Sequence, residues 1–379
     1  MTRSLRNSAV MMVVGARPQF IKSAPLIKEI VTKWKQICIT IVHSGQHYDP
    51  EMSAIFFRDL GVPEPSLNLR AGSGSHATQT ATIMKRLESS VAKAKPDMVI
   101  VPGDTNTTLA AALTAAKLGI PVAHVEAGLR SGEMTMPEEI NRKLTDHCSM
   151  LLFAPTPNAA GNLKKEGLGK LAYLTGDTMV EALKTAMPAV DRKQSEVLSR
   201  FDLLQHEYVL ATLHRSSNVD DLSRLGEIVH SLSRVAEKMR VVFPVHPRTR
   251  ARLADLGLLG SLKKNRVTVT APQGYVENLC LLSNAGCLLT DSGGMQKEAF
   301  MLHVPCITLR PVTEWPETLT RKANQLLTRP EMIPNMVSAT AGDEELRNDI
   351  RHLRNPFGDG HASARIAGVI QRWVRNHRL

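Results

Sequence analysis

Short apolar runs alternate with longer stretches of helical periodicity along the whole chain. Each run is a few residues long and rich in Val, Ile and Leu, which is typical of strands buried on both faces of a parallel sheet. A first series lies at residues 10–14, 37–42, 98–101, 122–125, 150–153 and 172–174, and a second at residues 209–213, 241–245, 267–269, 287–289 and 306–309. The alternation predicts an α/β fold in which helices cover parallel sheets.

The gap between the two series predicts two domains of similar size. A chain of 379 residues is also longer than one ordinary core requires. Residues 179–206 are expected to form a helix and a connector, interrupted at Pro188. The apolar spacing after residue 363 predicts an amphipathic helix that packs back on the first domain. The expected domains are therefore residues 1–177 together with residues 364–379, and residues 178–363.

Composition narrows the possible partners and compartments. Apolar residues make up 43% of the chain, but no run approaches the roughly 18 residues of a membrane span, so none is expected. The five cysteines form no CxxC pair, which argues against a zinc site or a disulfide framework and favours the cytoplasm. The net charge of +11 is scattered, and aromatic residues are only 4%, so we expect a phosphorylated small molecule as partner and no nucleic acid.

Polar residues recur where the predicted strands end. Ligands of open α/β sheets bind beyond the carboxyl ends of the strands, so these residues are candidates for chemistry. Turns and helix caps explain Gly, Asp or Ser at a single junction. They do not explain His, Arg and Glu at both sheets, in the segments 15–18, 45–47, 103–105, 124–126, 214–215, 246–247 and 291–294.

The junction after residues 287–289 predicts an anion site. Ser292, Gly293 and Gly294 open the next helix, and small residues there let backbone N–H groups face a diphosphate. Glu298, one turn further on, is placed to accept hydrogen bonds from ribose hydroxyls. Plain helix capping and a solvated helix surface are the alternative interpretations. Arg17 and Lys22, after the first strand, either neutralise phosphate or lie on the surface.

Acidic residues follow the strands of the first sheet. Asp104, Glu126 and Glu138 form a candidate acid/base group, since neighbouring carboxylates favour each other's protonated form. His214 and His246, at strand ends of the second sheet, complete a set expected to face the acids across a cleft. Each of these residues taken alone also fits a structural cap or a surface position. No metal-binding spacing occurs, and no metal is expected.

One motif matches the dinucleotide-binding fingerprint in sequence but is not expected to bind a dinucleotide. Residues 72–77 match the sequence pattern GxGxxA, and a helix is predicted over residues 78–94. No strand is expected before them, because residues 63–70 contain two prolines, and no acidic residue follows at the usual distance. Neither a nicotinamide nor any other cofactor is expected.

The strand-end motifs, taken in order, carry a family resemblance. They are Gly15-Ala16-Arg17-Pro18 with Lys22, Gly103-Asp104-Thr105, the run from His124 to Arg130, Pro137-Glu138-Glu139 with Asn141-Arg142, His214-Arg215, Pro244-Val245-His246, Asp291-Ser292-Gly293-Gly294 and Thr313-Glu314. This set, spread over residues 10–363, resembles the non-hydrolysing UDP-N-acetylglucosamine 2-epimerases. The resemblance implies two Rossmann-like domains arranged as in GT-B glycosyltransferases, a homodimer, and interconversion of UDP-N-acetylglucosamine and UDP-N-acetylmannosamine.

The resemblance also implies a mechanism and roles for residues. No carbonyl group adjoins C2 to acidify its proton, and without a nicotinamide no transient ketone can form, so elimination remains. A base removes the C2 proton while UDP leaves C1. UDP then adds back to the resulting 2-acetamidoglucal after protonation from the other face. Asp104, Glu126 and Glu138 then carry protons, and His214 assists the departing diphosphate. Candidates for substrate binding are Arg17, Lys22, His246, Ser292, Gly293, Gly294, Glu298 and Arg310.

The chain departs from the family pattern at several positions. Family members commonly have other residues at the positions that Ala16, Gln19, Ser217, Lys297 and Trp315 occupy in this chain. The segment Tyr48-Asp49-Pro50 replaces one linked to activation by a second substrate molecule, so no such activation is expected. Several of these variants resemble the branch that acts on UDP-2,3-diacetamido-2,3-dideoxy-glucuronate, which is the alternative substrate. A glycosyltransferase and a non-catalytic nucleotide-sugar-binding protein are the alternative classes.

Overall fold

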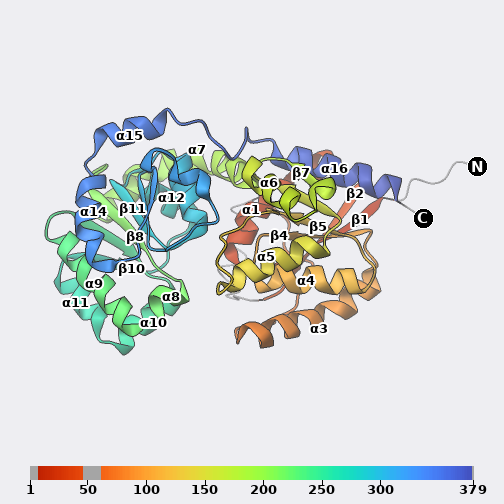
Figure 1. Ribbon diagram of the computed structural model, residues 1–379, viewed down its shortest axis with the longest axis horizontal. Helices are drawn as coiled ribbons and strands as arrows, with labels where there is room; N and C mark the ends of the chain where they lie inside the picture. Colours follow the sequence, from red (N-terminus) through yellow and green to blue (C-terminus); the bar gives the residue numbers. More distant parts are fainter. Residues whose placement is uncertain (1–6, 46–60, 378–379) are drawn as a thin grey trace, which may run out of the picture. The chain divides into compact units, whose positions relative to one another are not determined.

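The structure is a computed structural model that describes residues 7–45 and 61–377. The chain divides into two compact units, Met1–Lys184 with Pro356–Leu379 and Thr185–Asn355 (Figure 1). The division falls inside helix α7 (Thr178–Arg200), whereas the sequence placed the domain boundary just before that helix. The first unit therefore includes both the amino-terminal part of the chain and its last helix.

The described residues of the first unit form a sheet of seven parallel strands in the order β3-β2-β1-β4-β5-β6-β7. The strands are β1 (Ser8–Val14), β2 (Ile37–His43), β3 (Leu67–Asn68), β4 (Met98–Pro102), β5 (Val122–Val125), β6 (Leu151–Ala154) and β7 (Ala172–Leu174). The order reverses between β1 and β4, and open sheets of this kind bind ligands beyond the carboxyl ends at such a point.

Helices cover both faces of this sheet. They are α1 (Arg17–Lys33), α3 (His76–Ala94), α4 (Asn106–Lys117), α5 (Pro137–Cys148), α6 (Pro157–Lys165), the 3₁₀ helix η1 (Gly169–Leu171) and α16 (Ala362–Asn376). Strand β1 explains the uninterrupted apolar runs of the sequence. Val10 and Met12 pack in one cluster with α1 and α16, while Met11 and Val13 pack with α3 and α4, because successive side chains of a strand point to opposite faces.

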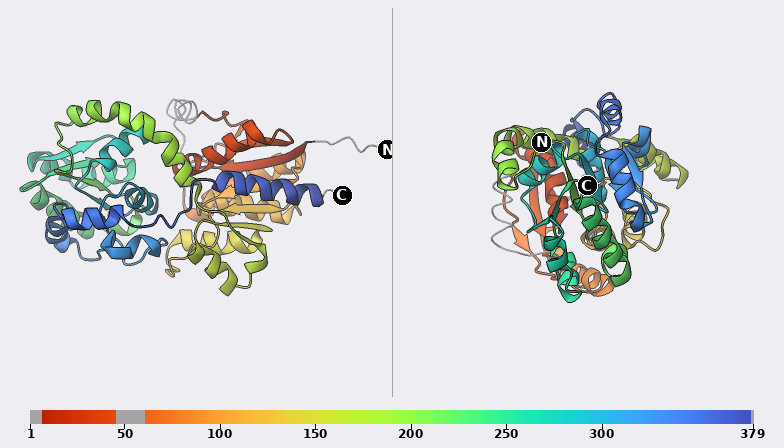
Figure 2. Two further views of the ribbon diagram at one scale, coloured as in Figure 1. Left: turned by 90° about the horizontal axis from the view of Figure 1, so that it is seen from above. Right: turned by 90° about the vertical axis from the view of Figure 1, so that its left-hand side faces the viewer.

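The predicted carboxyl-terminal helix is confirmed. Ile366, Ile370 and Val374 recur at helical spacing on α16 and are buried. They belong to the apolar cluster that contains residues of α1 and β1. Figures 1 and 2 show α16, in blue, lying along the first unit beside the red amino-terminal elements. The helix thus packs on the first unit, as its apolar stripe predicted.

The second unit repeats the architecture. Its described residues form a parallel sheet of six strands in the order β10-β9-β8-β11-β12-β13. The strands are β8 (Tyr208–Thr212), β9 (Arg240–Pro244), β10 (Val267–Thr270), β11 (Cys287–Thr290), β12 (Cys306–Thr308) and β13 (Asn324–Leu326). Here the order reverses between β8 and β11, so the ends of these two strands are the expected ligand-binding edge.

The helices of the second unit enclose this sheet. They are α8 (Ser216–Val219), α9 (Leu222–Ala236), α10 (Pro247–Asp255), α11 (Leu258–Lys264), α12 (Tyr275–Ser283), α13 (Gly293–Met301), α14 (Ile333–Thr340), α15 (Glu344–Arg351) and the 3₁₀ helices η2 (Pro316–Lys322) and η3 (Pro330–Met332). Among the helices of the described ranges, none combines the length and apolar character needed to cross a membrane.

Two sequence expectations were wrong. A short strand, β3, does precede residues 72–77 and pairs with β2, although two prolines stand just upstream. Helix α7 continues through Pro188 instead of breaking there. Proline removes only one main-chain donor, so the carbonyl of Lys184 loses its helical partner while the flanking turns persist. Strand β13 was not predicted, because its three residues Asn324–Leu326 carry too little apolar pattern.

Candidate functional site

Asp104 and Glu126 follow two neighbouring strands of the first sheet. Asp104 comes after β4 and Glu126 directly after β5, and these strands pair in parallel. Gly103 and Glu126 both have φ near +70°, a conformation that costs a non-glycine residue free energy. A Cβ added to Gly103 would lie 3.5 Å from Oε2 of Glu126. The acid of one strand end therefore packs against the turn that carries the other.

Glu126 is buried and forms an ion pair with Lys22. Its side chain is 3% exposed, and Nζ of Lys22, from α1, lies 2.7 Å from its Oε2. An unpaired carboxylate would be costly to bury at this position, so the lysine offsets the desolvation of Glu126. Lys22 was expected either to neutralise phosphate or to lie on the surface; in this structure its ammonium group contacts a carboxylate of the first unit.

Asp104 is held by helix α5. The guanidinium of Arg142 donates to Oδ2 of Asp104 from Nε at 3.0 Å and from Nη2 at 2.6 Å. The side-chain amide of Asn141 donates to the backbone carbonyl of Asp104 at 2.9 Å. Glu138 lies in the first turn of the same helix, one turn before Arg142. The three predicted acids thus lie on adjoining segments, and a different cation contacts each of Asp104 and Glu126.

Arg142 also anchors a second, deeply buried carboxylate. Its Nη1 donates to Oε2 of Glu139 at 2.9 Å, and Glu139 further accepts from the backbone N–H groups of Ser131 and Gly132. Burial alone would raise the pKa of Glu139, but these donors and the charge of Arg142 outweigh it and lower the pKa. Glu139 is therefore an anion that fixes the loop before α5.

Gln19 joins the ends of β1 and β4. Its Oε1 accepts from the backbone N–H groups of Gly15 and Ala16 at 2.8 and 3.0 Å. Its Nε2 donates to the carbonyl of Pro102 at 2.8 Å and to Oγ1 of Thr108 at 2.9 Å. The sequence identified Gln19 only as a departure from the family. Every hydrogen-bonding capacity of this buried amide is used at the switch point of the sheet.

Asp291 organises the edge of the second sheet. It follows β11, is fully buried, and accepts from the backbone N–H groups of His214 and Arg215 and from the amide of Asn218. Nδ1 of His214 lies 3.1 Å from its Oδ1, and the ring of His214 is 39% exposed. Burial would raise the pKa of Asp291, but the ring of His214 and the surrounding hydrogen bonds lower it to about 2. This anion orients an accessible imidazole.

The predicted phosphate segment begins α13. Ser292 is the N-cap, and its hydroxyl accepts from the backbone N–H of Met295 at 3.5 Å. A Cβ on Gly293 would lie only 2.0 Å from Oε1 of Glu314, so any side chain there would have to displace that carboxylate. Nη2 of Arg310 lies 2.7 Å from Oε2 of Glu314. The carboxylate of Glu314 thus lies beside both the N-terminus of α13 and a buried arginine.

Two departures from the family pattern contact each other. Nζ of Lys297 lies 3.9 Å from the centre of the Trp315 ring, and both residues are buried. A cation over the face of an indole is stabilised by the ring quadrupole, more strongly when both are shielded from water. Glu298, the candidate ribose contact, is the next residue on α13 and is 5% exposed.

His246 lies near His214 and is exposed. Their ring centres are 5.8 Å apart. Nδ1 of His246 accepts from the backbone N–H of Arg248, which caps α10. The structure therefore brings the two predicted histidines together at one edge of the second sheet.

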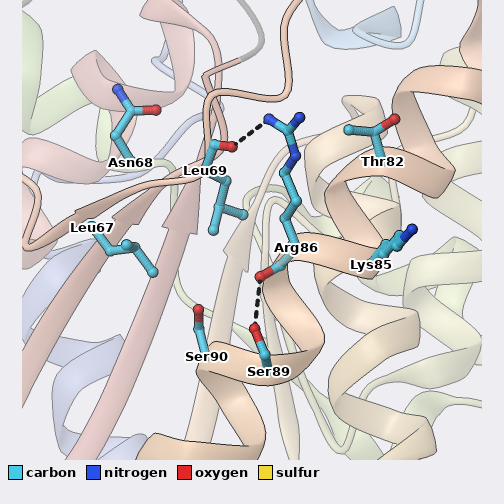
Figure 3. Close-up of a pocket in the computed structure, with 8 residues that line it drawn as sticks. All are labelled: Leu67, Asn68, Leu69, Thr82, Lys85, Arg86, Ser89 and Ser90. Atoms are coloured by element: carbon cyan, nitrogen blue, oxygen red, sulfur yellow. Dashed lines mark hydrogen bonds between the residues drawn. The ribbon is translucent and has the colours of Figure 1, made fainter.

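Two cavities are lined by other residues, apart from Asn218, which lines the smaller one and also donates to Asp291. One of about 620 Å³ lies between β3 and α3 (Figure 3), and its lining consists of Leu67, Asn68, Leu69, Thr82, Lys85, Arg86, Ser89 and Ser90. The other, of about 210 Å³, is lined by Ser217, Asn218, Arg224, Leu309, Pro311 and Thr328. No predicted site residue lines either cavity, so the candidate site is defined by the strand ends.

A family model described as UDP-N-acetylglucosamine 2-epimerase matches residues 30–371 of the chain. The chain belongs to the UDP-N-acetylglucosamine 2-epimerase family. Epimerases are isomerases, and the two parallel sheets with their helices have the GT-B-like fold of the solved epimerases.

Relatives within this epimerase family cover nearly the whole chain. A UDP-N-acetylglucosamine 2-epimerase homolog of Methanococcus maripaludis is 44% identical, covering 96% of this chain and 99% of the relative. A UDP-2,3-diacetamido-2,3-dideoxy-D-glucuronate 2-epimerase of Pseudomonas aeruginosa is 43% identical, covering 95% and 99%. The crystal structure of the Methanocaldococcus jannaschii UDP-GlcNAc 2-epimerase with UDP-GlcNAc and UDP aligns with a TM-score of 0.89 at 42% identity, covering 96% and 99%.

The predicted residues of this epimerase-family chain are divided between the two units. Lys22, Asp104, Glu126 and Glu138 lie in the first unit; His214, His246, Ser292, Gly293, Gly294, Glu298 and Arg310 lie in the second. The side chain of Arg17 and the segment from Gln46 to Pro50 lie outside the described part of the structure. Sequence reasoning assigned no role to Arg142 or Gln19. The available signals were that Arg142 belongs to one of the motifs that carry the family resemblance and that Gln19 departs from the family pattern.

Proposed function

We propose that this chain is a non-hydrolysing UDP-sugar 2-epimerase that interconverts UDP-N-acetylglucosamine and UDP-N-acetylmannosamine. The observation that carries the proposal is the pair of acids Asp104 and Glu126 at adjoining strand ends, each held by a cation. A relative that is 42% identical over 96% of this chain has been solved in complex with UDP-GlcNAc and UDP. Family membership and this acid pair together favour proton chemistry on a nucleotide sugar.

The chemistry requires two proton-transfer groups. The base removes the proton from C2 while the C1–O bond to UDP breaks, which leaves a C1–C2 double bond in 2-acetamidoglucal. A proton then returns to C2 from the opposite face as a UDP oxygen re-forms the bond to C1. Transfers on two faces call for separate groups. Asp104, Glu126 and Glu138 are proposed to provide them.

The second unit is proposed to bind UDP. Backbone N–H groups at the start of α13, in the segment 292–294, suit a diphosphate, because a helix N-terminus favours negative charge. The ring of His214, oriented by Asp291, is accessible and able to donate a hydrogen bond to the leaving diphosphate. Arg17, Lys22, His246 and Arg310 are proposed as further substrate contacts, and Glu298 is proposed to bind the ribose.

A second candidate substrate is UDP-2,3-diacetamido-2,3-dideoxy-glucuronate. The observation that favours it is the contact between Lys297 and Trp315, the two departures that resemble that branch. The Pseudomonas aeruginosa relative named for this substrate is 43% identical over 95% of the chain. The sugar carries an additional carboxylate, which a basic protein accommodates more readily than an acidic one.

We also propose that the protein is a homodimer of the cytoplasm and uses no cofactor. The family resemblance supports the dimer, and the spacing of the cysteines supports a reducing compartment. Sedimentation velocity of the purified chain tests the oligomeric state, and a monomer at micromolar concentration would contradict the dimer.

Incubation with UDP-N-acetylglucosamine in D₂O tests the function. Epimerisation by elimination places deuterium at C2 and yields a mixture of the two UDP-sugars, both visible by NMR. A glycosyltransferase or a binding protein leaves C2 protiated, and release of free N-acetylmannosamine as the main product indicates a hydrolytic enzyme. The same measurement with the diacetamido-glucuronate substrate decides between the two candidate sugars, because the preferred substrate exchanges faster.

A further inference from the structure

His124 is fully buried on β5, and both of its ring nitrogens contact acceptors. Nδ1 lies 2.6 Å from Oδ1 of Asp146, and Nε2 lies 2.7 Å from the backbone carbonyl oxygen of Gly103. A carboxylate and a carbonyl only accept hydrogen bonds. The ring therefore donates from both nitrogens and joins helix α5 to the turn after β4.

Asp146 is the fixed end of this connection. Its second oxygen accepts from the backbone N–H of Gly128 at 3.1 Å and lies 2.8 Å from Nη2 of Arg130. Burial alone would raise the pKa of Asp146, but the charges of His124 and Arg130 lower it. Asp146 is thus a buried anion with donors on both oxygens, and it holds the imidazole in one orientation.

The other end of the connection is the turn that carries Asp104. The N–H of Gly103 donates to the carbonyl of Val125 at 2.9 Å, and its carbonyl accepts from His124. A buried carbonyl that loses its donor is costly, so without this ring the turn would shift to find another partner. Glu126 packs against Gly103, and any shift of the turn changes the separation of the two acids.

We propose that His124 is a positioning residue, which clamps the Gly103 carbonyl and thereby holds Asp104 in its place relative to Glu126. The proposal rests on the proposed function, because the clamp acts on the residues assigned to proton transfer. It assigns His124 no contact with the substrate.

Asparagine and glutamine separate the two hydrogen bonds of His124. The amide nitrogen of Asn lies near the position of Nδ1, so His124→Asn keeps a donor for Asp146 and loses the bond to Gly103. The longer His124→Gln places its amide nitrogen near Nε2 and keeps the bond to Gly103. Asp146→Asn is the third variant, since its amide can donate to Nδ1 while the ring continues to donate to Gly103 from Nε2.

The experiment compares kcat, KM and the melting temperature of the three full-length variants with UDP-N-acetylglucosamine. We expect His124→Asn to lower kcat by about 10²-fold, the usual cost of a misplaced catalytic group, with KM little changed. His124→Gln and Asp146→Asn should stay within several-fold of the wild type, although Asp146→Asn lowers the melting temperature most. If kcat instead follows the melting temperature through the series, or His124→Asn keeps the wild-type kcat, the clamp is wrong.

Hydrogen–deuterium exchange separates failure of the clamp from failure of the proposed function. The amide of Gly103, protected by its bond to Val125, should exchange at least several-fold faster in His124→Asn than in His124→Gln. This result supports the clamp even in a chain that does not act on UDP-sugars. Equal exchange in both variants overturns the clamp, whereas wild-type protein without C2 exchange overturns only the epimerase assignment.

Discussion

Arg142 binds Asp104 through two guanidinium nitrogens on a single carboxylate oxygen, with Nε at 3.0 Å and Nη2 at 2.6 Å. Its remaining terminal nitrogen binds Glu139, so one buried side chain connects a candidate catalytic acid to the anion that fixes the loop before α5. The planar fork of arginine makes these bonds in a single orientation. Lysine cannot reproduce this geometry.

Arg142→Lys should therefore reduce turnover more than binding. A single ammonium cannot contact both Asp104 and Glu139 in the present arrangement, so Asp104 gains rotational freedom. We expect kcat to fall by about 10²-fold, in the range found when a catalytic group is misplaced, with a smaller change in KM. Steady-state kinetics measure both. Lys143→Ala on the same helix is the control and should behave as the wild type; an unaltered kcat in Arg142→Lys would refute the proposed anchoring.

Asp104→Asn and Glu126→Gln test the two acids directly. Each change keeps the size of the side chain but replaces a carboxylate with an amide that cannot accept and return a proton, and proton-transfer groups typically contribute about 10²–10⁴-fold to rate. Both variants should lose kcat on this scale and also lose deuterium incorporation at C2. Glu88→Gln, on an exposed face of α3, is the matched control. A near-normal rate in either variant would remove that residue from the mechanism.

Because of Asp291, the free energy of unfolding should depend on pH in the acid range. Its pKa is lowered to about 2 from the ordinary 3.8. A carboxylate whose pKa is lower in the folded state than in the unfolded state stabilises the fold at pH values above its unfolded pKa. This contribution is lost as the pH falls through its folded pKa. The shift corresponds to roughly 2 kcal/mol, present above about pH 4 and lost between pH 4 and 2.

Urea unfolding of the wild type and Asp291→Asn at several pH values measures this contribution. The wild type should be more stable at neutral pH, and the difference should narrow as pH approaches 2. Asp255→Asn is the control, because that carboxylate is 66% exposed and should change stability little. A difference that stays constant from pH 7 to pH 2 would disprove the assigned shift.

Gly293→Ala tests the packing of the proposed diphosphate site. The new methyl group would lie 2.0 Å from Oε1 of Glu314 and must displace that carboxylate from Arg310. Gly260→Ala, on α11, is the control, since no atom lies within 4 Å of its added methyl group. Isothermal titration with UDP should give a roughly tenfold or greater loss of affinity in Gly293→Ala only, about 1.4 kcal/mol. Equal losses would mean that Glu314 has no part in the site.

The sequence predicted the parts of the fold that local pattern encodes. Buried parallel strands require continuous apolar runs, and these runs located most strands of both sheets. The amphipathic spacing of Ile366, Ile370 and Val374 predicted α16 and the face it buries. Strand β13 and the course of α7 through Pro188 escaped prediction, because a very short strand has no period to detect and the neighbouring turns of a helix outweigh one missing hydrogen bond.

The sequence by itself determined which residues are available to the site. Strand-end position singled out Asp104, Glu126, His214 and Ser292, because parallel strands present their carboxyl ends at one edge. Only the tertiary structure decided their partners. Lys22 meets Glu126 across 104 positions and Arg142 meets Asp104 across 38, and no local period records which cation folds onto which acid. Local pattern reports solvent exposure and backbone period, whereas charge pairing depends on where distant segments pack.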